Sequence, residues 1–295
     1  MSFAFFSSMP FTTSSDSWLE EIEEGIKSES KSNVVLKVLQ YYRMNSNIST
    51  KGNYDFETRL HLPQCQSTND VLLGMAKEKN GQIPEGFLVS TDFQEAGRGQ
   101  KNNKWESEPG QNLMFSLFLK PGFLEAKLAF WLSASIAIGT AKALENYLPE
   151  VKVKWPNDLL VNGLKIGGIL IENVVSGRNI SESVVGIGLN INQIHLISTA
   201  TSLAKERNQD FDREEILQLI IQEILLVYQR LRLENWEKIR SLYYAKLYKM
   251  AIPHDYKLPD GQQFRGVLKG ISEEGKLIVI AADGEKRFNF KEVGF

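Results

Sequence analysis

Cysteine and histidine are scarce in this sequence. One cysteine, Cys65, occurs among 295 residues, so the chain cannot form an intrachain disulfide framework, and this fits a reducing compartment. The three histidines lie at positions 61, 195 and 254, with no cysteine cluster beside them. The ligand spacing that is typical of zinc sites is therefore missing.

An excess of one charge is missing as well. Lysine and arginine total 34 and aspartate and glutamate total 36, which gives a formal net charge of −2, whereas a nucleic-acid-binding domain is usually basic. No apolar run reaches the length that spans a membrane. The N-terminal residues lack the cationic start and long apolar core of a signal peptide. These absences predict a cytoplasmic protein that binds neither DNA nor a membrane.

What the sequence does contain divides into three parts. Residues 1–50 are rich in serine and acidic residues and predict an N-terminal extension, partly disordered. Residues 51–249 mix strand-like and helix-like patterns, and residues 250–295 hold short strands separated by "PDG", "EEG" and "ADG" turns. The last pattern is typical of a small barrel-like β module. The expected fold class is α+β, with hydrophobic residues forming 42% of the chain and sufficient for a sizeable core.

The middle part carries the main elements. Hydrophobic periodicity predicts strands over 58–63, 86–92, 112–120, 151–155, 159–172 and 183–192, and helices over 67–81, 125–148, 212–232 and 234–247. Ser67 or Thr68 is the expected N-cap of the first helix, with Asp70 in its first turn. Asn162 and Gly163 are expected to form a type I′ turn between two strands.

A glycine-rich, cationic loop joins two of these strands, in the stretch "EAGRGQKNNKW". Its glycines allow backbone N–H groups to approach an anion, and its Arg98, Lys101 and Lys104 can neutralise one. It is not a P-loop, because no Gly-Lys-Ser/Thr follows at the right spacing. A loop of this kind is expected to become ordered over a ligand; the alternative is a solvated basic surface loop.

A second segment, "KWPNDLLVNGLKIGGILIE", runs from Lys154 to Glu172. Pro156 is expected to end a strand, and the turn that follows holds Asn157 and Asp158. The alternation of side chains along a strand puts Lys165 and Gly167 on one face, where a lysine above a glycine floor suits a carboxylate or phosphate. The alternative is an edge-strand lysine beside glycines at a bulge.

Two shorter segments could also contact a ligand. The hydroxyls and amide of "STND" can cap a helix or bind a small polar molecule. In "GIGLNIN", Asn190 and Asn192 follow a strand and can bind a phosphate with its cation, or only close a turn.

These four segments, in this order, resemble the biotin–protein ligase family, and the resemblance runs from about Leu60 to the C-terminus. It implies a catalytic domain like that of class II synthetases, with a mixed sheet flanked by helices, followed by an SH3-like barrel. It also implies a two-step reaction with Mg²⁺. Biotin and ATP give biotinyl-5′-AMP and pyrophosphate, and a lysine of a biotin carboxyl carrier domain then takes the biotin and releases AMP.

The resemblance also implies roles for individual residues. The expected catalytic residues are Lys165, Arg98 and Asp158. The expected biotin-binding residues are Ser67, Thr68, Asn69, Gln94, Arg98, Gly99, Gln100, Lys165 and Gly168. The expected ATP-binding residues are Gly97, Arg98, Lys101, Asn103, Trp105, Asn112, Asn157, Asp158 and Asn190, the last also facing the phosphate-bound Mg²⁺. Asp158 or solvent could accept the proton of the incoming lysine.

Three other functions are weighed against this one. A lipoate–protein ligase would share the fold and chemistry, but the Arg-Arg-x-Ser-Gly-Gly-Gly stretch usual in that family is missing. A biotin-responsive repressor needs an N-terminal DNA-binding domain, whereas residues 1–50 are short for one and carry the acidic run "EEIEEG". A non-catalytic biotin binder would not need Lys165 and the "GRG" core. The monofunctional ligase is favoured, and an exposed strand edge could make it a homodimer.

The cationic loop departs from the arginine-rich form that the family often shows, Gly-Arg-Gly-Arg-Arg-Gly-Arg. Here Gln100, Lys101, Asn102 and Asn103 replace Arg, Arg, Gly and Arg. Because lysine and amides lack the guanidinium fork, we expect this protein to retain biotinyl-AMP less well than a variant with the arginine-rich loop. Adenylate released into solution during turnover measures this. Equal release from the two proteins would count against the expectation.

Overall fold

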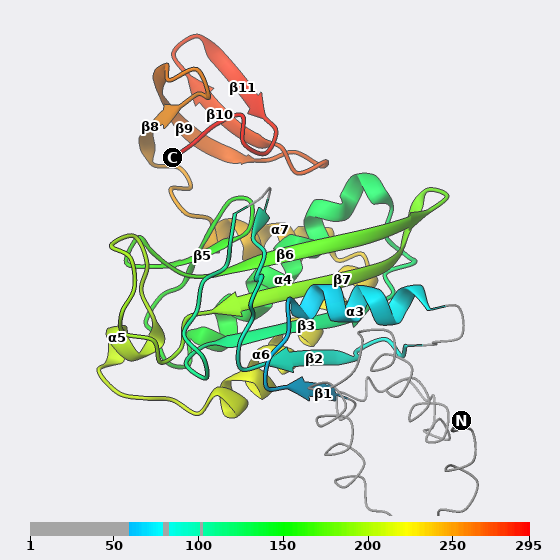
Figure 1. The fold of residues 1–295 in the computed structure, drawn as a ribbon. Coiled ribbons are helices and arrows are strands. Elements are labelled where there is room, and N and C mark those ends of the chain that lie inside the picture. Colours follow the sequence, from blue (N-terminus) through cyan, green and yellow to red (C-terminus); the bar gives the residue numbers. More distant parts are fainter. Residues whose placement is uncertain (1–58, 79–82, 101–102) are drawn as a thin grey trace, which may run out of the picture.

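The central element of the fold is a mixed seven-stranded sheet (Figure 1). The computed structural model describes residues 59–78, 83–100 and 103–295, so the expected N-terminal extension lies outside the described residues. The sheet has the strand order β1-β2-β3-β7-β6-β5-β4; β1 and β2 are parallel and all other neighbours are antiparallel. The strands are β1 (Arg59–Leu62), β2 (Leu88–Thr91), β3 (Leu113–Leu119), β4 (Lys152–Lys154), β5 (Asp158–Val161), β6 (Leu164–Ser176) and β7 (Asn179–Leu189).

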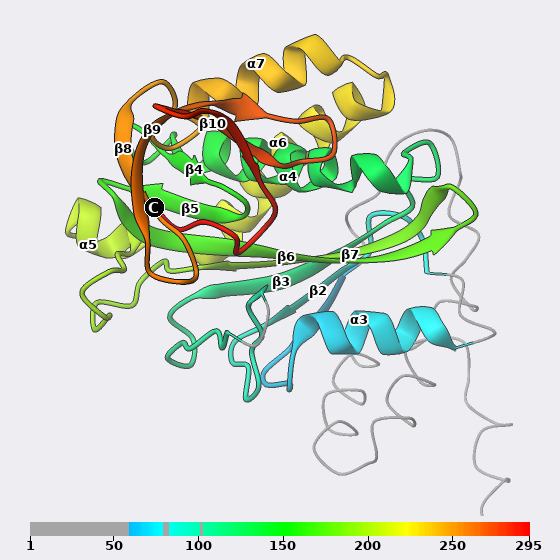
Figure 2. The same cartoon turned by 90° about the horizontal axis from the view of Figure 1, so that it is seen from above.

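Helices cover both faces of this sheet, as Figure 2 shows. On one face lie α4 (Ala129–Leu144), α6 (Arg213–Arg232) and α7 (Trp236–Lys246), whose apolar side chains form the main core with the strands. On the other face lies α3 (Thr68–Lys77), which packs a smaller core against β1–β3 and β7. The apolar sequence of α4 explains why most of that helix is buried between the sheet and α6. Two short helices, η2 (Ala126–Leu128) and α5 (Leu203–Arg207), lie in connections.

The predicted C-terminal β module is a four-stranded antiparallel sheet with the order β11-β10-β9-β8. Its strands are β8 (Pro253–Lys257), β9 (Gln263–Ile271), β10 (Leu277–Ala281) and β11 (Gly284–Phe288). The turn between β9 and β10 contacts the larger part of the chain, where the indole N–H groups of Trp131 and Trp155 donate to the carbonyls of Glu273 and Gly275, both at 2.9 Å. The α+β fold class is thus confirmed, while a domain boundary at residue 249 stays a prediction.

Local sequence signals account for several of the element boundaries. Asp212 and Asn235 cap α6 and α7 through side-chain oxygens that accept backbone N–H groups. Asn162 and Gly163 both have positive φ, 50° and 80°, as the predicted type I′ turn requires. Among the described residues, no helix combines the length and apolar character needed to cross a membrane.

Two helical glycines should respond oppositely to replacement by alanine. A Cβ on Gly139 of α4 would lie 2.6 Å from the Cα of Ile224 in α6, whereas a Cβ on Gly74 of α3 would meet no atom within 4 Å. We expect Gly139→Ala to lower the free energy of unfolding by about 1–3 kcal/mol through overpacking. We expect Gly74→Ala to raise it by about 0.5–1 kcal/mol, because alanine restricts the unfolded chain. Urea denaturation measures both, and a stable Gly139→Ala protein would refute the close crossing of α4 and α6.

Candidate functional site

One cavity of about 310 Å³ brings the predicted segments together on the α3 side of the sheet. This volume is within the usual range for a small-molecule site. The predicted residues that line it are Ser67, Thr68, Asn69, Gln94, Arg98, Gly99, Gln100, Asn103, Trp105, Asn157, Asp158, Lys165 and Gly168. Lys101 lies outside the described residues, and its role stays a prediction.

The N-terminus of α3 forms one end of the cavity. Ser67 occupies the N-cap position, as predicted, but its side chain makes no capping hydrogen bond. Instead, the Oε1 atom of Gln94 accepts the backbone N–H of Thr68 at 2.8 Å. Gln94 therefore satisfies one of the first N–H groups of the helix, which have no partner within the helix, and this contact ties the glycine-rich loop to α3.

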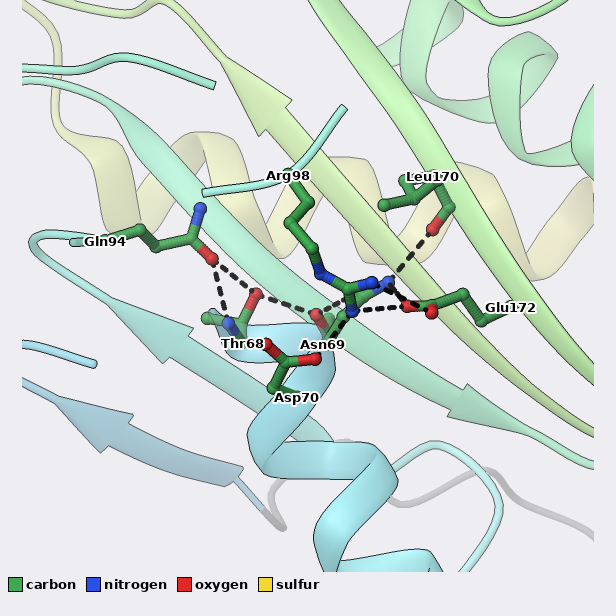
Figure 3. A network of polar contacts seen from close by, with 8 residues as sticks. Thr68, Asn69, Asp70, Gln94, Arg98, Leu170 and Glu172 are labelled. Atoms are coloured by element: carbon green, nitrogen blue, oxygen red, sulfur yellow. Dashed lines mark hydrogen bonds and ion pairs between the residues drawn. The ribbon is translucent and has the colours of Figure 1, made fainter. Parts of the chain in front are cut away.

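Asn69 has a fixed orientation in this end of the cavity (Figure 3). Its Oδ1 atom accepts the buried hydroxyl of Ser116 at 2.6 Å, and its Nδ2 group donates to Glu172 at 2.8 Å and to the carbonyl of Leu170 at 3.3 Å. A Cβ at Gly186 would overlap the Asn69 amide, so glycine at that position makes room for it. The amide is thus held by three elements, α3, β3 and β6.

Arg98, predicted to contact an anion, is already paired. Its guanidinium lies 2.6 Å from Asp70, and it makes two contacts with Glu172, at 3.0 and 3.2 Å (Figure 3). The loop around it is a small hairpin, in which Arg98 bridges Lys104 and the N–H of Trp105 donates to the carbonyl of Gly97 at 2.9 Å. The loop is therefore attached to α3 and β6 through the Arg98 side chain.

Trp105 lies flat against the sheet because Gly188 has no side chain. A Cβ on Gly188 would be 2.7 Å from the indole ring. Two polar atoms that belong to cavity-lining residues, Nε1 of Trp105 and Oε1 of Gln100, are buried and have no hydrogen-bond partner within the described structure. Buried polar groups are normally paired, so these two atoms keep unused hydrogen-bonding capacity next to the cavity.

The opposite end of the cavity is charged. The Nζ atom of Lys165 lies 2.6 Å from Oδ1 of Asp158, and both flank Gly168. The expectation that Lys165 and Gly167 share a face is wrong. The β5–β6 register shifts between Leu159 and Leu160, so a bulge turns Gly167 toward Leu189 in the core and leaves Lys165 on the face of Gly168. The bulge named in the alternative is present, but β6 lies between β7 and β5, so Lys165 is not on an edge strand.

Three predicted ATP-binding residues do not line this cavity: Gly97, Asn112 and Asn190. The amides of the last two are used inside the protein. Asn112 accepts the N–H of Ile191 at 3.0 Å, and Asn190 donates to the carbonyl of Thr201 at 3.0 Å. In the part of the chain that the structure describes, no group of three or more His, Cys, Asp or Glu side chains could hold a metal ion. The role of Asn190 beside a phosphate-bound cation stays a prediction.

Comparison with known proteins places this geometry in a family. Residues 61–190 match the Biotin/lipoate A/B protein ligase family. The chain therefore contains a ligase domain of this family. Bifunctional ligase/repressor BirA of Bacillus subtilis is 30% identical over 216 residues, which cover 70% of this chain and 66% of that protein. Biotin–[acetyl-CoA-carboxylase] ligase of Paracoccus denitrificans is 28% identical, with 79% of this chain and 99% of that protein covered.

The structural comparison agrees with this assignment. The biotin protein ligase from Aquifex aeolicus in complex with biotin and ATP superposes with a TM-score of 0.68 at 26% identity, over 81% of this chain and 98% of that chain. The resemblance to the biotin–protein ligase family that the sequence motifs indicate is thus confirmed. The chain spans 66% of the length of the Bacillus relative.

The ligase domain also has cavity residues that the sequence analysis did not assign. Lys154 is the last residue of β4, and Gly186 and Gly188 of β7 form part of the floor. The end of the chain contributes a wall that holds Phe290 and Phe295, with Nζ of Lys154 5.5 Å from the Phe295 ring centroid. A backbone bridge between Lys257 and Gly294 brings this segment back to β8. No local pattern signals such an approach.

The orientation of Asn69 gives a test with a compensating partner. Asn69→Asp would replace the donor that faces Glu172 and the Leu170 carbonyl by an oxygen, which should lower the free energy of unfolding by about 1–3 kcal/mol. The loss should shrink below about pH 5, where protonation of the new carboxylate restores a donor. Adding Glu172→Gln should recover part of the stability at neutral pH, because the glutamine amide can donate in the reverse direction. Urea denaturation at several pH values tests this, and a loss that is independent of pH would contradict the assigned orientation.

Proposed function

We propose that this protein is an ATP-dependent biotin–protein ligase. The observation that carries the proposal is the polarity of the cavity. The α3 end has neutral hydrogen-bonding groups and an arginine that is paired with carboxylates, and the other end has a lysine–aspartate pair. Biotin has the matching polarity, because a neutral ureido ring lies at one end and a carboxylate at the other. The complex of the Aquifex aeolicus relative with biotin and ATP supports the same pair of substrates.

In this proposal the ureido ring of biotin binds at the start of α3. Ser67, Thr68 and Asn69 are buried there and offer hydroxyl and amide groups. Gln94 lies against the same turn through the Thr68 N–H. These uncharged groups can donate to the ureido oxygen and accept from its N–H groups without the cost of burying a charge.

The biotin carboxylate then extends to Lys165, which neutralises it beside Gly168. One carboxylate oxygen attacks the α-phosphorus of ATP, the bond to the β-phosphate oxygen breaks, and pyrophosphate leaves. Lys165 is placed to stabilise the charge on the acyl phosphate that forms. Arg98 pairs with two carboxylates, so the proposal gives the remaining phosphate charge to Lys104 and Lys154, which also line the cavity.

ATP would bind on the side of the cavity formed by Asn103, Trp105 and Asn157. The amide of Asn157 donates to the carbonyl of Ile169 at 2.6 Å, so it chiefly shapes the turn at that side. The described residues do not form a cage for a divalent cation. Mg²⁺ is therefore treated as part of the substrate, bound to the phosphates of ATP.

In the second step a lysine amine of an acceptor protein attacks the acyl carbon of biotinyl-AMP. The bond to the phosphate oxygen breaks, an amide forms and AMP leaves. The amine must lose a proton, and Asp158, which lines the cavity beside Lys165, or solvent can accept it. We propose a biotin carboxyl carrier domain of a carboxylase as the acceptor, as the name of the Paracoccus denitrificans relative suggests.

The test is pyrophosphate release with ATP, Mg²⁺ and either biotin or lipoate, followed by transfer to a biotin carboxyl carrier domain. We expect release with biotin, and a loss of about 100-fold or more in Lys165→Ala, because one preorganised charge contact is removed. Lys238→Ala, on the exposed surface of α7, is the matched control and should leave the rate unchanged.

Release with lipoate alone would instead assign the protein to the lipoate branch of the family. Biotin binding without release in the unmodified protein would make it a binder and not an enzyme. Full activity of Lys165→Ala would remove Lys165 from the mechanism.

A further inference from the structure

Glu172 and Asp70 are two carboxylates next to the cavity that the reaction above does not use. Both contact Arg98, and neither appears among the described residues that line the cavity. They stand behind its wall, on β6 and on the first turn of α3. Any effect of these carboxylates on a bound ligand must therefore act through the residues that they contact.

The contacts converge on Glu172. Its Oε2 atom accepts from Asn69 at 2.8 Å and from Nη2 of Arg98 at 3.0 Å, while its Oε1 atom accepts from Nη1 of Arg98 at 3.2 Å. Two parallel N–H···O bonds between a guanidinium and a carboxylate fix both groups in plane, which a single contact does not. One carboxylate thus fixes a side chain from the helix and one from the glycine-rich loop.

The charges of this cluster argue against direct phosphate binding by Arg98. One guanidinium faces two carboxylates, so the group formed by Arg98, Asp70 and Glu172 carries a net charge of −1. A phosphate that approached Arg98 would meet this residual negative charge and would have to displace a bidentate partner. Other cations, Lys104, Lys154 and Lys165, line the cavity without these two acidic neighbours.

The loop backbone explains what this contact controls. Arg98 lies between Gly97 and Gly99, and the N–H of Gly99 donates to the carbonyl of Asn103 at 2.6 Å. A Cβ on Gly97 would lie 2.7 Å from the carbonyl of Trp105 and 3.1 Å from the amide of Gln94. Displacement of Arg98 would therefore shift two cavity walls, Gln94 and Trp105.

We infer that Glu172 is a positioning residue, which holds Arg98 and Asn69 so that the loop and α3 form the biotin end of the cavity, with Asp70 as a second anchor. In this inference, Arg98 positions the glycine-rich loop by binding Glu172, and it does not bind the phosphates of ATP. The inference deepens the proposed function and rests on it. Loss of the contact should weaken biotin binding and loosen the hold on the adenylate, while the charged end at Lys165 stays in place.

The decisive experiment is a double-mutant cycle on biotin-dependent pyrophosphate release with Arg98→Gln, Glu172→Gln and the double variant. We expect each single change to lower kcat/KM for biotin about 10-fold, chiefly through KM, with more biotinyl-AMP released to solution. The double variant should have a kcat/KM no lower than that of the less active single variant, because all three variants break the same contact. Glu182→Gln, on the adjacent strand β7, is the matched control and should behave as the unmodified protein.

The opposite outcome is equally clear. If Arg98 contacts phosphate directly, Arg98→Gln should lower kcat, and the two losses should multiply to about 100-fold in the double variant. That result would overturn the inference. Arg98→Lys, which keeps the charge and loses the fork, should fall between the unmodified protein and Arg98→Gln if the bidentate contact is what counts.

A second measurement needs no ligand and separates this inference from the proposed function. Trypsin can cleave after Lys104, at the end of the loop hairpin. Cleavage of the folded protein there should be several-fold faster in Glu172→Gln than in the unmodified protein or in Glu182→Gln. Equal rates would refute the positioning role even if the ligase reaction is found. If Glu172→Gln is cleaved faster but the unmodified protein has no ligase activity, the positioning role of Glu172 stands and the proposed function is rejected.

Discussion

The cavity depends on three positions on one face of the central sheet that carry no side chain. Gly168 and Gly188 are opposite each other on β6 and β7, and Gly186 lies two residues before Gly188 on the same face. A Cβ at either β7 position would collide with Asn69 or with the Trp105 ring. Because the sheet is bare there, α3 and the glycine-rich loop can approach it and still leave space for a ligand. The other face of the same strands is filled with core side chains.

Much of this arrangement could be predicted from the sequence because its signals are local. Alternating and continuous apolar runs predict β2, β3 and β7, and the apolar and amphipathic patterns predict α4 and α6. The Asn-Gly turn fixes the β5–β6 hairpin, because both of its residues need positive φ. The site segments could be grouped only through their resemblance to a family. Taken alone, each had a plausible structural explanation, such as a surface loop, a helix cap or a turn.

The remaining features depend on contacts between distant residues. The alternation of side chains fails at Lys165, because β6 has one extra residue between Lys165 and Gly167 relative to its partner strand β5. Asn112 and Asn190 have the residue type of ligands, but their amides already bind backbone groups of Ile191 and Thr201, which lie 79 and 11 positions away. Glu172 is the last residue of an apolar strand motif, and nothing in the nearby sequence predicts its contact with Arg98, which lies 74 positions away. Residue type and spacing indicate which hydrogen bonds or ion pairs a side chain can form. The fold determines whether other residues of the protein already occupy those bonds.

The two ends of the cavity differ in charge, because some of the charged side chains are already paired within the protein. At the α3 end, Arg98 lines the cavity but is paired with carboxylates outside the wall, and the other groups that a ligand meets there are amides and hydroxyls. At the other end, Lys165 has the single carboxylate of Asp158 beside it, and Lys154 lies over the ring of Phe295. A neutral ring and an anionic group are therefore favoured at opposite ends.

The wall of the charged end includes residues 290–295. The indole N–H groups of Trp131 and Trp155 donate to backbone carbonyls and hold the C-terminal sheet against the rest of the chain. The charged end consequently needs both sheets, whereas the neutral end is formed by the larger sheet, α3 and the loop.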